Sequence, residues 1–115
     1  MAHVLVIDDD ADIREALRCL LEAEGHRVTE AADGRMALGS LARGRVDVIV
    51  LDLMMPVMNG WEFREAQRGD PALADIPVIV ISAAAQRRPV EAAAFLAKPF
   101  DASRLIELVG EHVST

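Results

Sequence analysis

The sequence predicts an α/β fold in which a parallel sheet is covered by helices on both faces. Short apolar runs, rich in β-branched residues, alternate with amphipathic stretches along the chain. Most of these runs are apolar throughout, as in strands buried on both faces, and right-handed crossovers would join them. The chain has 115 residues, of which 52% are hydrophobic. This is enough for one core, so we expect a single domain over residues 1–115.

The strands are expected where these runs stand out between turn residues. The second run along the chain is weaker than the other four. In chain order, the predicted strands are Val4–Ile7, Arg27–Ala31, Val46–Leu51, Val78–Ile81 and Ala94–Ala97.

Helices are expected between these strands. Apolar residues recur at helical spacing in the first amphipathic stretch (Ile13, Leu17, Leu20, Leu21) and in the last (Leu105, Leu108, Val109). Trp61 and Phe63 are expected to pack a third helix. The segment Gln86–Ala93 is too short, and too interrupted by proline, to predict a regular helix.

Capping residues agree with this order of elements. Asp10 or Asp12 can cap the first helix, and Gly25 can end it. Asp33 can open the second helix and Gly44 can close it.

Charge and cysteine content restrict the partners and the compartment. The formal net charge of −7 would repel a nucleic-acid backbone or an anionic membrane, so we expect neither as a direct partner. Cys19 is the only cysteine, which rules out an internal disulfide and suits the reducing cytoplasm. The first apolar run meets acidic residues before it reaches the length of a signal peptide. We therefore expect a cytoplasmic protein.

Polar residues that can bind a metal or a phosphate follow four of the five predicted strands. They are Asp8, Asp9 and Asp10 after the first strand, Asp52 after the third, Ser82 after the fourth and Lys98 after the fifth. In an open, doubly wound sheet the ligand site forms beyond the carboxyl ends of the strands. These side chains are therefore expected to converge.

Converging carboxylates repel one another, so they need a proton, a cationic partner or a bound metal. Mg²⁺ (or Mn²⁺) takes oxygen ligands and is commonly held by one or two carboxylates together with phosphate oxygens. Asp52 could then attack a phosphorus atom in line and form an acyl phosphate. Lys98 and Ser82 would face the transferred group, where positive charge stabilises phosphoryl transfer.

Four ordered motifs resemble the response-regulator receiver domain, the phosphoacceptor module of two-component signalling, over essentially the whole chain. They are residues 4–10 (VLVIDDD), residues 51–60 (LDLMMPVMNG), residues 81–83 (ISA) and residues 98–100 (KPF). The resemblance implies a flavodoxin-like fold with strand order 2-1-3-4-5. It also implies that the protein signals and is not an enzyme beyond self-phosphorylation and slow autodephosphorylation.

The resemblance assigns roles at the site residue by residue. It implies that Asp52 is phosphorylated and that Asp8 and Asp9 bind Mg²⁺ together with Asp52. The main-chain carbonyl of Met54 would be a further metal ligand, and Lys98 would pair with the phosphoryl oxygens. A histidine kinase or histidine phosphotransfer protein would be the donor, and a downstream protein would be the target.

The same resemblance implies a switch at Ser82 and Phe95. In the family, the hydroxyl residue at the position of Ser82 moves toward the phosphoryl group and the aromatic residue at the position of Phe95 turns inward. Here the stretch from Ser82 to Lys98 is several residues shorter than is usual, so we expect a shortened fourth helix. This departure predicts an output surface that differs from the usual one.

Simpler interpretations remain for each of these residues. Asp8 and Asp9 could be a solvated capping cluster, and Lys98 could be a surface lysine at a turn. Ser82 could satisfy local backbone groups, and Phe95 could be an ordinary core residue.

Two other functions remain as alternatives. An aspartate-nucleophile phosphatase would carry a second acidic residue two places after the nucleophile, where this chain has Met54. A degenerate receiver would bind partners without phosphorylation, which the complete set of site residues argues against. Because no further domain follows in this sequence, output is expected through binding to another protein, unless the chain is a fragment.

Overall fold

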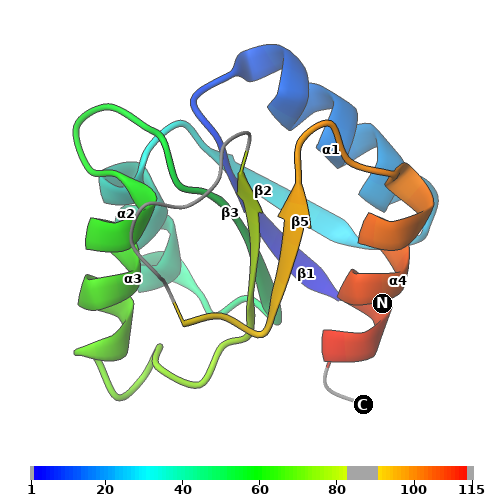
Figure 1. Cartoon of the computed structure of the whole chain (residues 1–115). Coiled ribbons are helices and arrows are strands. Elements are labelled where there is room, and N and C mark those ends of the chain that lie inside the picture. Colours follow the sequence, from blue (N-terminus) through cyan, green and yellow to red (C-terminus); the bar gives the residue numbers. More distant parts are fainter. Residues whose placement is uncertain (1, 83–90, 114–115) are drawn as a thin grey trace.

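A parallel sheet forms the middle layer of a three-layer α/β structure, with helices on both sides (Figure 1). The computed structural model describes residues 2–82 and 91–113. Its strands are β1 (His3–Ile7), β2 (Arg27–Ala31), β3 (Val48–Asp52), β4 (Val78–Ser82) and β5 (Ala94–Ala97). Their order is β2-β1-β3-β4-β5, and all neighbours are parallel. This confirms the predicted fold class and strand order.

The helices within the described residues cover the two faces in pairs. They are α1 (Ala11–Ala23), α2 (Gly34–Arg43), α3 (Gly60–Arg68) and α4 (Ala102–His112). The buried apolar side chains of α2 and α3 belong to one core cluster, and those of α1 and α4 belong to the other. The sheet therefore separates two cores, as its alternating side-chain directions require. No helix in the described part of the chain is long and apolar enough to span a membrane.

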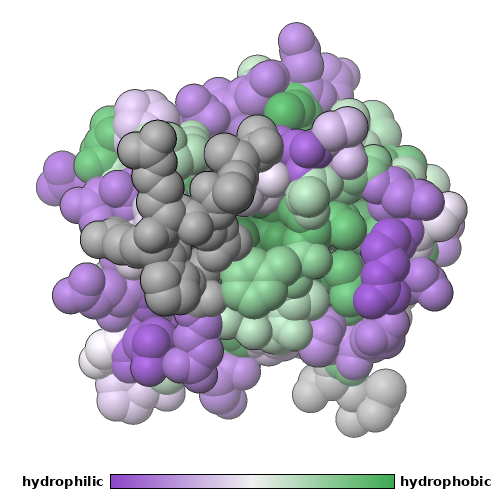
Figure 2. Space-filling model, viewed as in Figure 1, coloured by the Kyte–Doolittle hydropathy of each residue, from purple (hydrophilic) through white to green (hydrophobic). Residues whose placement is uncertain are grey.

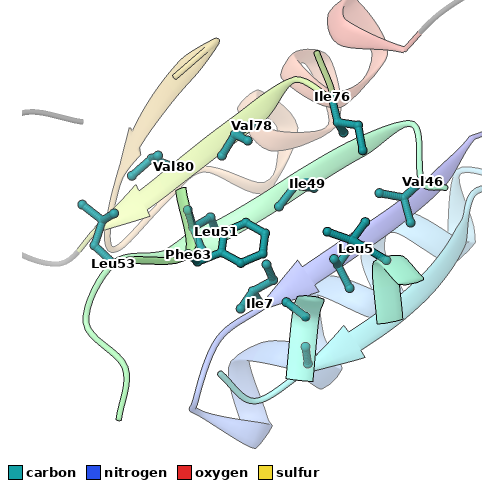
Figure 3. Close-up of a cluster of buried hydrophobic side chains, with 13 residues drawn as sticks. Leu5, Ile7, Val46, Ile49, Leu51, Leu53, Phe63, Ile76, Val78 and Val80 are labelled. Atoms are coloured by element: carbon teal, nitrogen blue, oxygen red, sulfur yellow. The ribbon is translucent and has the colours of Figure 1, made fainter. Parts of the chain in front are cut away.

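The core beneath α2 and α3 contains the largest fully buried side chain, that of Phe63 (Figure 3). Phe63 packs among residues of β1, β3 and β4, and Trp61 is partly buried against the same cluster. This confirms the prediction that both aromatic residues pack α3. Burial of such side chains contributes about 2 to 3 kcal/mol each toward folding.

The central strands are the most buried ones. Every residue of β3 is buried, whereas β5 alternates between half-buried and exposed residues because it lies at an edge of the sheet. Figure 2 shows an apolar area over β5 on the molecular surface. Phe95 is 50% exposed there, so the interpretation of Phe95 as a core residue is wrong.

Helix caps lie at the residues that the sequence indicated. Asp10 caps α1 by accepting hydrogen bonds from the amides of Asp12 and Ile13, which decides between the two candidates. Gly25 follows α1 with a φ of 90°, a conformation that suits glycine. Asp33 caps α2 and Gly44 ends it.

Some expected strand boundaries differ from the observed ones by one or two residues. β1 begins at His3, and β3 begins at Val48, two residues after the expected start. Asp52 and Ser82 are the last residues of β3 and β4, not the residues that follow them. The expected shortened fourth helix falls largely on residues 83–90, which lie outside the described residues.

Candidate functional site

The candidate site lies at the carboxyl edge of the sheet, where β1, β3, β4 and β5 end side by side. Ile7 pairs with Leu51, and Asp52 pairs with Ile81. Asp8 therefore leaves β1 next to the end of β3, where Asp52 lies. Lys98 follows β5, and its amide donates a 2.8 Å hydrogen bond to the carbonyl of Ser82 at the end of β4.

Three carboxylates gather at this edge. One oxygen each of Asp8, Asp9 and Asp52 lies within 4.8 Å of the other two. Asp8 and Asp52 are buried, with 2% and 5% of their surface exposed, and Asp9 is exposed. The carboxylates of Asp8 and Asp52 thus form the buried floor of the cluster, and the carboxylate of Asp9 faces the solvent.

Lys98 supplies a positive charge to the buried floor of this cluster. Its Nζ lies 3.0 Å from Oδ2 of Asp8 and 3.6 Å from Oδ1 of Asp52. Burial lowers the pKa of Lys98, but the hydrogen bond to Asp8 and the charges of Asp52 and Asp8 outweigh it and raise that pKa overall. Because its pKa is raised, Lys98 remains a cation that bridges two carboxylates. The peptide bond between Lys98 and Pro99 is cis.

Asp52 has a perturbed ionisation. Burial, followed by the negative charge of Asp8, raises the pKa of Asp52 to about 6, although the charge of Lys98 and a hydrogen bond from the main chain of Met54 act in the opposite direction. A carboxyl with this pKa is mostly ionised at neutral pH, and a further cation nearby would favour the ionised form.

The loop after β3 is held close to Asp52 by Gly60. A Cβ atom at Gly60 would lie 2.6 Å from the Cα of Leu53 and 2.7 Å from the carbonyl oxygen of Asp52. The Gly60 amide donates a 2.9 Å hydrogen bond to the Leu53 carbonyl, and Asn59 and Glu62 form a capping box at the start of α3. Val57 has a φ of 65°, which is strained for a β-branched residue.

The loop after β1 is held by its own aspartates and by Arg14. The amide of Asp10 donates to Oδ1 of Asp8, and the amide of Asp8 donates to the Ala31 carbonyl of β2. Nη1 of Arg14 donates a 2.7 Å hydrogen bond to the carbonyl of Asp8. Arg14 was not among the predicted site residues, and the available signal was a basic residue in the first turn of the helix that follows the acidic run.

The donor set of this cluster fits a hard divalent cation. Three carboxylates within reach of one ion offer only oxygen ligands. Mg²⁺ and Mn²⁺ prefer oxygen ligands, whereas softer metals prefer other donors. Lys98 neutralises one negative charge, so the three carboxylates and the lysine together carry an excess of negative charge that a cation would balance.

The structure brings most of the predicted site residues together. Asp8, Asp9, Asp52 and Lys98 form one cluster, and Ser82 ends the strand beside Lys98. The side chain of Met54 is 64% exposed, and the role of its carbonyl as a ligand stays a prediction. Phe95 pairs with Val80, two residues before Ser82, so it lies outside the cluster.

Comparison with known proteins agrees with this fold. The profile of the response regulator receiver domain matches residues 4–110. The chain therefore belongs to the response regulator receiver domain family, whose members are signalling modules of two-component systems.

Among named relatives, the chain is 43% identical over 83 residues to the response regulator MprA of Mycolicibacterium vanbaalenii, which covers 70% of this chain and 34% of that protein. It is 32% identical over 112 residues to the response regulator SaeR of Staphylococcus aureus, which covers 92% of this chain and 48% of that protein. The chain thus spans about a third to a half of these two relatives. A third relative, an uncharacterized 14.6 kDa protein of Leptolyngbya boryana, is 37% identical and is covered over 88% of its length.

Solved structures are similar over nearly the whole chain. The chemotaxis response regulator CheY4 of Vibrio cholerae has a TM-score of 0.88 at 34% identity, covering 98% of this chain and 99% of that one. The receiver domain of the sensor histidine kinase PA1611 of Pseudomonas aeruginosa has a TM-score of 0.91 at 26% identity, covering 99% and 98%. That structure has a magnesium ion coordinated in its active site cleft.

Proposed function

We propose that the chain is a phosphoacceptor of two-component signalling, in which Asp52 receives a phosphoryl group in the presence of Mg²⁺. The observation that carries this proposal is the position of Lys98, whose ammonium group lies 3.0 Å from Asp8 and 3.6 Å from Asp52 at a cluster of three carboxylates. Burial, followed by the charge of its neighbour Asp8, raises the pKa of Asp52 to about 6.

In the proposed reaction, an Oδ atom of ionised Asp52 forms a bond to phosphorus. The bond from phosphorus to the donor breaks, and its electron pair leaves with the imidazole of a phosphohistidine or with the carboxylate of acetyl phosphate. No general base is needed, because the attacking carboxylate carries no proton. Lys98 stabilises the negative oxygens of the transferred group and orients them toward the buried floor of the site.

Asp8, Asp9 and Asp52, with the main-chain carbonyl of Met54, would hold the Mg²⁺ ion. The ion, when bound, supplies charge neutralisation for the entering phosphoryl group. Asp8 also holds Lys98, so its two oxygens have different tasks: Oδ2 accepts from Lys98, and Oδ1 accepts from the amide of Asp10. The PA1611 receiver, with magnesium in its cleft, supports this assignment by similarity.

A histidine kinase or histidine phosphotransfer protein is the proposed donor, and a protein target is the proposed receiver of the signal. Phosphorylation would change the position of the Ser82 hydroxyl and of Phe95, which lie on the neighbouring strands β4 and β5. Because Phe95 is half-exposed in this structure, an inward turn of its ring would change the apolar surface over β5. A population shift between these two arrangements would constitute the switch.

The proposal is tested by intact-mass measurement after incubation with acetyl phosphate, in Mg²⁺ and in EDTA. We expect the wild type to gain the mass of one phosphoryl group in Mg²⁺ only, and Asp52→Asn to gain none. Asp75→Asn is the matched control, because Asp75 is an exposed aspartate that pairs with Arg45 before β4. Equal gain in Asp52→Asn and wild type would reject Asp52 as the acceptor. No gain in wild type would favour a receiver that binds partners without phosphorylation.

A further inference from the structure

The loop of three aspartates that follows β1, residues 8–10, is the acidic loop. Arg14 contacts the main chain of Asp8 in this loop. It is in the first turn of α1, and its side chain is 18% exposed. Nη1 donates a 2.7 Å hydrogen bond to the carbonyl of Asp8, and Nε lies 3.3 Å from Oε1 of Glu30 in β2. One guanidinium therefore joins the acidic loop to the neighbouring strand.

This contact completes the main-chain bonding of Asp8. The amide of Asp8 donates a 3.1 Å hydrogen bond to the carbonyl of Ala31, and its carbonyl accepts from Arg14. Ala31 and Glu30 are adjacent residues of β2. Both polar groups of the Asp8 peptide backbone are thus tied to the end of one strand, one of them directly and the other through Arg14.

The loop needs such a restraint because its negative charges repel one another and therefore oppose the close arrangement of its carboxylates. Asp8, Asp9 and Asp10 are consecutive, and the first two direct carboxylate oxygens toward Asp52. Like charges at this distance repel one another, so a free loop would move its exposed carboxylate, that of Asp9, away from the cluster. A cation site requires the carboxylates to stay close, and a loop that is already fixed loses less conformational entropy when it binds the ion.

We propose that Arg14 is a positioning residue for the cation site, acting through the Asp8 carbonyl and the Glu30 carboxylate. This inference rests on the proposed function, because it concerns the same Mg²⁺ site. The guanidinium suits the task, since it is planar and donates from separate nitrogens to two acceptors at once. A lysine carries the same charge, but its single ammonium group lacks this fork geometry.

Arg18 offers a matched control within the same ion-pair group. Arg18 lies one helical turn after Arg14, and its Nε lies 3.5 Å from Oε2 of Glu30. Within the described residues it forms no hydrogen bond or ion pair with Asp8. Replacing either arginine by methionine removes one positive charge and keeps most of the apolar length of the side chain. The loss of a positive charge by itself would strengthen Mg²⁺ binding slightly, so weaker binding in only one variant has to come from the lost restraint.

The experiment is calorimetric titration of Mg²⁺ into the metal-free wild type, Arg14→Met, Arg18→Met and Arg14→Lys. We expect Kd to rise about tenfold in Arg14→Met, as for other groups that orient metal ligands, and to stay within about twofold in Arg18→Met. Arg14→Lys should also bind more weakly than wild type, and it serves as the test should Arg14→Met fail to fold. Melting temperatures in EDTA, recorded in parallel, separate general destabilisation from a specific effect on the ion.

Equal Mg²⁺ affinity in wild type and both Arg14 variants would overturn the positioning role while leaving the proposed function intact. An equal loss of affinity in Arg14→Met and Arg18→Met would also overturn it, because the effect would then not run through Asp8. A wild type that binds no Mg²⁺ would overturn the cation site of the proposed function and this inference together.

Discussion

Burial governs the ionisation of Asp52. Its carboxyl is 5% exposed, lies at the end of a fully buried strand and faces the charge of Asp8, so its pKa rises from 3.8 to about 6. Because the folded protein holds this proton more tightly than the unfolded chain, the carboxyl favours the folded state most strongly below pH 4. That contribution is lost as the pH rises through about 6.

We therefore expect Asp52→Asn to stabilise the metal-free protein at neutral pH. The neutral amide avoids the cost of a buried charge, so the gain at pH 7.5 should be about 2 to 3 kcal/mol. The gain should disappear near pH 4, where wild-type Asp52 is protonated in the folded state. Thermal or urea unfolding in EDTA at the two pH values measures it. A gain of equal size at both pH values would show that ionisation is not its cause.

Phe63 and Phe95 differ in exposure, and this predicts different mutational costs. Phe63 is fully buried, whereas Phe95 is 50% exposed on an edge strand. Phe63→Ala should cost about 3 to 5 kcal/mol in the free energy of unfolding, and Phe95→Ala about 1 kcal/mol or less. Denaturant unfolding of both variants makes the comparison. A cost above about 2 kcal/mol for Phe95→Ala would contradict its exposed position.

The junction between β3 and α3 depends on a close approach of two backbone segments. Gly60 begins α3 directly against Leu53 and Asp52, and the capping box fixes the direction in which the helix starts. The element that carries Asp52 and the helix that covers it are thus joined without room for a side chain. Gly39 differs from Gly60 in this respect. It lies within α2, and a Cβ atom added there would meet nothing within 4 Å.

Gly60→Ala and Gly39→Ala should therefore have opposite effects. The added methyl at Gly60 would displace the backbone next to Asp52 and should cost about 1 to 3 kcal/mol or more. The added methyl at Gly39 meets no atoms and raises helix propensity, so it should stabilise by about 0.5 to 1 kcal/mol. Urea unfolding curves decide this. A stable Gly60→Ala variant that still gains a phosphoryl group as the wild type does would contradict the tight junction.

The site joins parts of the molecule that are far apart in sequence. Asp8 leaves β1, Asp52 ends β3 and Lys98 follows β5, so ligands at this edge connect strands across most of the sheet. Binding of a cation there should stabilise the folded state as a whole, because the unfolded chain cannot bring these groups together.

We expect Mg²⁺ to raise the melting temperature of the protein. At a concentration one hundred times Kd, the stabilisation should be about 2.7 kcal/mol, or roughly 10 °C for a domain of this size. The control is NaCl at the same ionic strength, which screens the carboxylates without binding between them. Equal shifts with NaCl and MgCl₂ would argue against a specific site.

Local patterns were sufficient to predict much of this protein. Apolar runs and their turn residues predicted the strands and a parallel sheet, because burial on both faces leaves a continuous apolar signal, whereas the order of the strands was implied by the family resemblance. Side chains such as Asp10, Asp33 and Gly25 predicted helix ends, because capping acts between near neighbours in sequence. The convergence of Asp8, Asp52 and Lys98 was predictable too, because the ends of parallel strands meet at one edge.

Contacts between distant residues were decided only by the folded structure. The sequence predicted that Lys98 lies at the same edge as the aspartates, and the structure shows that its ammonium group lies closer to Asp8, 90 residues away along the chain, than to Asp52. The exposure of Phe95 depends on the place of β5 at the edge of the sheet, and the role of Arg14 depends on Glu30 in the next strand. Such distances, exposures and pKa values arise from how the elements pack, which no local pattern of residues encodes.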